Sequence, residues 1–162
     1  MHKSTLTNSK SKRRSTVLLV LLFLLVVALF PLRFVKITLL HDTLIVFEKA
    51  FEIQWIHSVE KEEWIESYEV KGDKLILTTT AFKTFGAGVP SDGLVEVRDD
   101  GYVHMTINRE MDEIYLVVSD LVKTTIHFET KELPLYELVD DYEEVLIESK
   151  WLPWWNILIG KN

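Results

Sequence analysis

A histidine and a glutamate fall on the predicted apolar face of one β-hairpin. The two strands come before and after an acidic turn, and each alternates apolar and polar residues. A turn centred between Lys61 and Glu62 would place His57 directly opposite Glu66, with Cβ atoms about 4.5–5.5 Å apart. Such a pair could act as a general base oriented by a carboxylate or as half of a metal site. Alternatively, the two groups satisfy each other as a structural pair.

The turn beside this pair is rich in carboxylates. Glu60, Glu62 and Glu63 could supply oxygen ligands to a divalent cation, or they could form an ordinary solvated turn. The calcium-loop pattern Asp-x-Asp-x-Asp-Gly does not occur in the sequence. Ser58 points to the opposite face of the strand from His57, so the two are poorly placed as nucleophile and base.

A glycine-rich segment, Phe85-Gly86-Ala87-Gly88-Val89-Pro90, follows a later predicted strand. It lacks the third glycine of a dinucleotide fingerprint, the Lys-Ser/Thr of a P-loop and a helix after it, so the pattern argues against phosphate binding. One interpretation is an ordered loop that brings backbone N–H groups near a ligand or near His57. The other is a simple bend between strands.

Other signs of catalysis are weak. There is no cysteine, and no serine occurs in a Gly-x-Ser-x-Gly elbow. His104 and His127 fall on separate predicted strands and are expected to be ordinary strand residues rather than zinc ligands. The sequence therefore assigns no catalytic residue, no metal ligand and no cofactor, and it does not favour an enzyme.

The elements that must position these residues are short strands. Segments rich in Val, Ile, Thr, Phe, Tyr and Trp are separated by turn signals, which predicts an all-β fold, a small antiparallel sandwich or a partly open barrel. The predicted strands are 35–40, 44–47, 51–58, 64–70, 75–82, 94–97, 102–108, 114–118 and 124–128. Only residues 137–149 show a possible helical period.

Charge is distributed unevenly along the chain. The first sixteen residues carry five bases and no acid, whereas the remainder has 13 Lys and Arg against 25 acids, a formal net charge of −12. An acidic domain repels phosphate backbones, so nucleic-acid binding is not expected. The absence of cysteine leaves the compartment open.

The N-terminal region carries a membrane or export signal. Residues 1–16 are basic, and residues 17–30 form an uninterrupted apolar run that extends to position 35 with few interruptions. We expect residues 17–35 to form a single-pass anchor, with the N-terminus cytoplasmic and residues 37–162 forming an extracytoplasmic β-domain. The alternative is a signal peptide cleaved after Ala28, which would release a secreted protein.

The C-terminus concentrates tryptophan. Trp151, Trp154 and Trp155 lie within nine residues, after an acidic run expected to be a solvated face. This stretch could form an interfacial anchor or a contact surface for a membrane partner, but we prefer a terminal strand that closes the core.

Two motifs in order resemble a known family. Ile56-His57-Ser58-Val59-Glu60, then Glu66, then Phe85-Gly86-Ala87-Gly88-Val89-Pro90 resemble the bacterial "domain of unknown function 1850" over roughly residues 38–130. The positions that match the motif are the candidate ligand- or partner-binding residues: His57, Ser58, Glu60, Glu66, Phe85, Gly86, Ala87, Gly88 and Pro90. The resemblance implies a small exported protein associated with tripartite ATP-independent periplasmic (TRAP) transporters of the TAXI type, and it implies no reaction.

Two functions follow as hypotheses. The first is a membrane-tethered accessory module that contacts the transporter membrane subunit or its solute-binding protein. The second is a stand-alone domain that binds a small ligand or a divalent cation through the His57/Glu66 hairpin and the 86–90 loop. A third possibility, an enzyme using His57 and Glu66, would need both groups for activity but not for folding.

Overall fold

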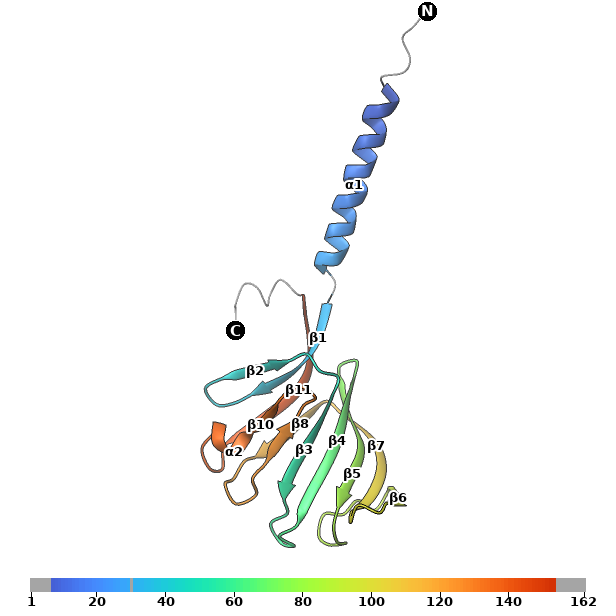
Figure 1. Ribbon diagram of the computed structural model, residues 1–162. Helices are drawn as coiled ribbons and strands as arrows, with labels where there is room; N and C mark the ends of the chain where they lie inside the picture. The colour runs from blue at the N-terminus through green and yellow to red at the C-terminus, as the bar shows by residue number, and fades with distance from the viewer. Residues whose placement is uncertain (1–6, 30, 154–162) are drawn as a thin grey trace, which may run out of the picture. The chain divides into compact units, whose positions relative to one another are not determined.

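The structure, a computed structural model, describes residues 7–29 and 31–153 (Figure 1). Helix α1 (Thr7–Leu29) contains the apolar run, and its side chains from Val17 to Val26 are exposed. Among the described residues, no helix combines the length and apolar character that a membrane crossing requires. The predicted anchor over residues 17–35 is not one helix in the structure, because the helix ends at Leu29 and a strand begins at Pro31.

Residues Arg33–Lys150 form one compact unit, built from two antiparallel sheets. One sheet has the order β2-β1-β11-β8 and the other has the order β10-β9-β3-β4-β5-β7-β6. The strands are β1 (Pro31–Thr38), β2 (Thr43–Val46), β3 (Ala50–Ile56), β4 (Glu63–Lys71), β5 (Lys74–Phe82), β6 (Leu94–Val97), β7 (Val103–Met111), β8 (Glu113–Val117), β9 (Thr125–His127), β10 (Glu132–Pro134) and β11 (Glu144–Pro153). The predicted all-β antiparallel fold is confirmed.

The main core lies between the two sheets, because alternate residues of each strand turn inward. Val35 and Ile37 of β1 and Val145 of β11 are fully buried against inner-face residues of the larger sheet, such as Ile53 of β3 and Leu75 of β5. Each such side chain contributes about 1.5–3 kcal/mol when removed from water. This core accounts for the pairing of strands that lie far apart in the sequence.

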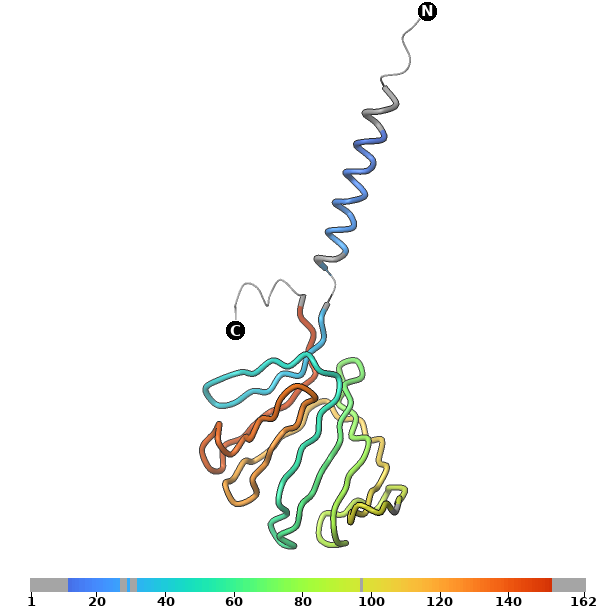
Figure 2. Tube along the Cα trace, in the orientation of Figure 1, coloured from blue at the N-terminus to red at the C-terminus, as the bar shows by residue number. Residues whose placement is uncertain are grey.

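A second, smaller core belongs to the larger sheet alone. Trp64 of β4, Phe82 of β5 and Met105 of β7 are buried together, with Val89 from the glycine-rich segment packed against them. The glycine-rich segment therefore covers this part of the sheet. Figure 2 shows the β5–β6 connection at the same end of the molecule as the β3–β4 turn.

The β3–β4 hairpin has the predicted faces but a different register. Trp55 faces Trp64 rather than Tyr68, and Ile53 rather than His57 faces Glu66. The turn is centred between Val59 and Glu60, whereas the prediction centred it between Lys61 and Glu62. The predicted apposition of His57 and Glu66 is therefore wrong.

The C-terminal region also differs from its prediction. The possible helix over 137–149 is wrong, because α2 covers only Leu135–Leu138 and a strand begins at Glu144. Val145, Ile147 and Ser149 are buried while Glu144 and Lys150 are exposed, which is the two-residue period of a strand. A strand runs over 144–153, so residues 151–153 of the tryptophan-rich stretch are extended, but Trp151 is exposed and does not close the core; Trp154, Trp155 and the rest of that stretch lie outside the described residues.

Candidate functional site

A row of stacked rings positions His57. Trp55 stacks on Trp64 with ring centroids 5.7 Å apart, and His57 stacks on the same indole at 5.3 Å. The row continues across β5, where Phe82 lies 4.9 Å from Trp64 and Phe85 meets Phe82 edge to face at 5.3 Å. Stacking on Trp64 thus positions the imidazole, and Phe85 joins the glycine-rich segment to the same group of rings.

The turn that contains His57 is closed by backbone hydrogen bonds. The His57 N–H donates to the Glu62 carbonyl at 2.8 Å, which continues the β3–β4 register by one pair. The Lys61 N–H donates to the His57 carbonyl at 2.9 Å. Lys61 has a φ of 59°, a left-handed conformation that lets a four-residue loop reverse the chain.

Glu60 joins this turn to the glycine-rich segment. Its Oε2 atom forms an ion pair with His57 Nδ1, and its Oε1 atom accepts a hydrogen bond from the Ala87 N–H at 3.1 Å. The Val59 N–H also points at His57 Nδ1, at 3.4 Å, but the Glu60 contact is much closer. We therefore assign the Nδ1 proton to the bond with Glu60. We call these contacts the Glu60 clamp.

The clamp depends on a glycine at position 86. A Cβ built on Gly86 would lie 2.6 Å from the Glu60 carboxyl carbon, closer than real Cβ contacts allow. Gly88 has a φ of +80°, and a Cβ there would be 3.9 Å from His57 Nε2. The two glycines therefore serve different purposes, since Gly86 leaves space for a carboxylate and Gly88 adopts a conformation that side chains disfavour.

The electrostatics of the clamp favour an ionised Glu60. The hydrogen bond from the Ala87 backbone lowers the pKa of the Glu60 carboxyl most, and His57 lowers it further, while partial burial opposes both. A carboxylate that accepts hydrogen bonds from a backbone N–H and an imidazole is stabilised in its charged form. An imidazole oriented by a carboxylate is the geometry expected of a general base, with Glu60 in place of the predicted Glu66.

Glu66 lies elsewhere on the inner face. It faces Ile53 on β3 and the fully buried Thr80 on β5, and its Oε2 atom accepts a hydrogen bond from the Tyr68 hydroxyl. Burial raises the pKa of the Glu66 carboxyl, while the Tyr68 bond and the positive charge of Arg109 lower it. The structure therefore removes Glu66 from the site that contains His57.

The remaining predicted site residues occupy the exposed side of the clamp. Ser58, Phe85, Gly86, Ala87 and Gly88 are exposed, and Pro90 is half-buried. The structure thus brings together both predicted motifs, with the exception of Glu66. Among the described residues, no group of three or more His, Cys, Asp and Glu side chains is arranged to hold a metal ion.

The sequence-based prediction missed a polar network beside the clamp. Glu63 accepts hydrogen bonds from Gln54 Nε2 at 2.5 Å and from the Tyr102 hydroxyl, and Lys83 Nζ lies 3.4 Å away. The bond to Glu63 raises the pKa of Tyr102 to about 12, and Tyr102 and Lys83 lower the pKa of Glu63. No local pattern identifies this network, because Tyr102, which comes just before β7, meets Glu63 only through the pairing of β4, β5 and β7.

Comparison with known proteins agrees with these motifs. The family model described as "Domain of unknown function (DUF1850)" matches residues 51–135, which include both loops of the Glu60 clamp. Searches of the curated proteins and of the solved structures found no match.

Proposed function

We propose that this chain, which belongs to the DUF1850 family, is an exported binding module that holds a protein partner with the two loops of the Glu60 clamp. One observation carries the proposal. The Glu60 carboxylate bonds both to His57 in its own turn and to the backbone of Ala87, 27 residues further along the chain.

The clamp presents apolar side chains to solvent on ordered backbone. Val59, in the turn, is 69% exposed, and Phe85, in the glycine-rich segment, is 64% exposed. Large exposed apolar side chains on loops that are joined to each other are typical of interaction sites. Loops that are already fixed lose less conformational entropy on binding, so the Glu60 clamp would raise affinity through pre-organisation.

The partner that we propose is the membrane subunit of a TAXI-type TRAP transporter or its solute-binding protein. Support for this choice comes from the resemblance of the two motifs, which implies that association. The same loops contain no sequence signature of a nucleotide, phosphate or calcium site. Contact with a protein surface is therefore the use that best suits two exposed, ordered loops that carry Val59 and Phe85.

Export is part of the same proposal. Five bases followed by the apolar run 17–30 are the pattern of a segment that carries the following domain across a membrane. A phosphatase that is active only outside the cytoplasm, fused after residue 162, should be active. N-terminal sequencing of the purified protein then decides between a retained anchor and cleavage after Ala28.

Site-specific photo-crosslinking tests the partner. A photoreactive residue replaces Val59 or Phe85 in the full chain, and crosslinking is done in native membranes. Tyr115, which is 62% exposed on β8, provides the matched control position. We expect adducts with a transporter membrane subunit or solute-binding protein from positions 59 and 85, and several-fold fewer from position 115.

A second variant connects the adduct to the Glu60 clamp. Glu60→Ala in the Val59 and Phe85 photoprobe proteins should reduce the adduct several-fold while the β-sheet circular dichroism is retained. The proposal fails if neither position forms an adduct with a transporter protein, or if position 115 forms as much.

A further inference from the structure

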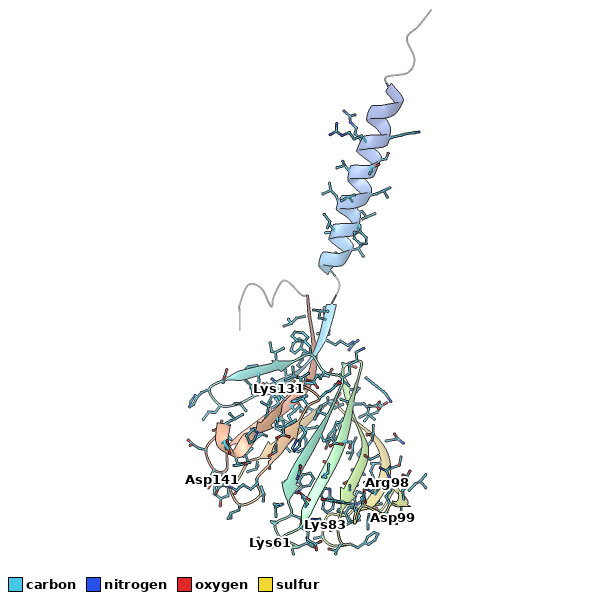
Figure 3. All side chains as sticks on the ribbon, viewed as in Figure 1. Lys61, Lys83, Arg98, Asp99, Lys131 and Asp141 are labelled. Carbon is cyan, nitrogen blue, oxygen red and sulfur yellow. The ribbon has the colours of Figure 1, made fainter. Side chains whose placement is uncertain are left out.

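A second exposed apolar surface lies where three chain reversals meet. They are the β1–β2 turn at Leu39–Asp42, the β8–β9 loop at Val118–Thr124 and the α2–β11 connection at Val139–Glu143. Figure 2 shows these three reversals following one another along one side of the molecule. In Figure 3, Asp141 marks this side, and Lys61 marks the β3–β4 turn, which lies elsewhere in the domain.

Hydrogen bonds between the reversals fix their arrangement. The Glu143 carboxylate accepts bonds from the backbone N–H groups of Leu40, at 2.7 Å, and Asp140, at 3.3 Å. The Asp120 N–H donates to Asp141 Oδ1 at 2.7 Å, and the Tyr142 N–H donates to the Val118 carbonyl at 2.7 Å. The three segments therefore form one ordered surface.

This surface exposes large apolar side chains. Leu121 is 76% exposed and Tyr142 is 72% exposed, and Leu40 in the β1–β2 turn and Leu138 at the end of α2 are also exposed. We call these four residues the α2 patch. A groove of about 240 Å³ runs between Leu39 of the β1–β2 turn and Leu138 of α2. Four such side chains on ordered loops are typical of an interaction site rather than of scattered surface residues.

Carboxylates surround the α2 patch. Asp42, Glu137 and Asp140 are exposed at its edge, and Glu143 lines the groove together with His41. The nearby base Lys123 is paired with Asp120 and lies over the Tyr136 ring, so its charge is already engaged. The edge of the patch is therefore negative.

We propose that the α2 patch binds a basic amphipathic segment of a partner protein, in which Lys or Arg side chains flank a short apolar run. Charge complementarity selects this occupant. The acidic edge repels anionic lipid headgroups and also repels a second copy of the patch. The proposal is independent of the Glu60 clamp, because none of the residues is shared.

Photo-crosslinking from the patch tests this occupant. A photoreactive residue replaces Leu121 or Leu138 in the full chain, because both side chains are exposed and neither position belongs to the core. Leu94, which lies on β6 and is 75% exposed against 76% for Leu121, is the matched control. Crosslinked peptides are sequenced by mass spectrometry from native membranes. We expect adducts from positions 121 and 138 with segments that contain Lys or Arg next to apolar residues.

Charge reversal supplies the second measurement. Glu137→Lys together with Asp140→Lys reverses the edge without removing Asp141 or Glu143, which hold the loops together. We expect the adduct to fall about tenfold while the thermal midpoint stays close to that of the parent. The adduct yield of the parent protein should fall similarly in high salt, because salt screens the attraction between the acidic edge and a basic segment.

The other outcomes overturn the proposal. Adducts with lipid, with a second copy of this chain or with acidic segments identify a different occupant. An equal yield at position 94, an unchanged yield after charge reversal or no adduct at either patch position also contradicts it. Loss of the Val59 and Phe85 adducts alone would contradict the proposed function and leave this result unaffected.

Discussion

The Glu60 carboxyl group occupies the space that a side chain on Gly86 would need. A Cβ on Gly86 would stand 2.6 Å from the Glu60 carboxyl carbon, while Oε1 of the same group accepts the Ala87 N–H at 3.1 Å. The Glu60 carboxyl group can keep this position only while residue 86 has no side chain.

Gly86→Ala should act through Glu60. The added methyl group displaces the carboxylate, so the Ala87 hydrogen bond and the His57 ion pair are lost together. We expect Gly86→Ala and Glu60→Ala each to lower the urea midpoint, and the double variant to be no worse than the poorer single variant. Additive losses in this double-mutant cycle would contradict the relationship.

Glu60→Gln should change how stability depends on pH. Hydrogen bonds lower the folded-state pKa of Glu60 below its value in the unfolded chain, so the stabilisation is present above the unfolded value, near 4.5. It is lost as the pH falls through the lowered folded-state value. We expect the parent to be more stable than Glu60→Gln at pH 7 and the difference to disappear in acid. Urea unfolding at several pH values measures it, and a difference that grows in acid would refute the assignment.

Glu66→Gln should have the opposite pH dependence. Burial raises the folded-state pKa of Glu66, so the native state favours the protonated acid. That stabilisation is fully present below the unfolded value and is lost as the pH rises through the folded-state value. Glutamine retains an acceptor for the Tyr68 hydroxyl without the charge. The variant should match the parent near pH 4 and become progressively more stable than it toward pH 8. A relative stability that falls with pH would contradict this account.

Thr80→Val should destabilise the second core. Thr80 is fully buried, and its Oγ1 atom accepts the Trp64 indole N–H at 2.7 Å. Valine has nearly the same shape but leaves the indole donor unsatisfied, which costs about 1–3 kcal/mol of the free energy of unfolding. Chemical denaturation measures the loss.

A second substitution separates the hydrogen bond from packing. Trp64→Phe removes the donor, so Thr80→Val should cost much less in that background than in the parent. An equal cost in both backgrounds would mean that the effect comes from packing around position 80.

Alternation of apolar residues determined which face each strand buries. It placed Ile53 and Trp55 of β3 on the same side as Trp64 and Tyr68 of β4, and the structure agrees. It did not determine the register, because sliding one strand past the other by an even number of residues leaves every side chain on its predicted face. The turn decided the register, through the left-handed conformation of Lys61.

Strand β11 likewise shows that a local pattern and long-range pairing determine different things. Residues 145, 147 and 149 are apolar or small, but Leu146 between them is apolar too, so the pattern is also compatible with a weak helical period over so short a segment. Pairing with β8, which joins Leu146 to Tyr115, decided for the strand. This pairing joins two strands that are far apart in the sequence, so no pattern of neighbouring residues predicts it.

By itself, the sequence determined the all-β class, the acidic charge of the domain and the two motifs that meet at the site. Only the tertiary structure decided that Glu60, and not Glu66, is the partner of His57. The physical reason is that hairpin register and the approach of Gly86 to Glu60 depend on loop closure and on packing between strands. Those terms involve residues distant along the chain, whereas composition and periodicity are local properties.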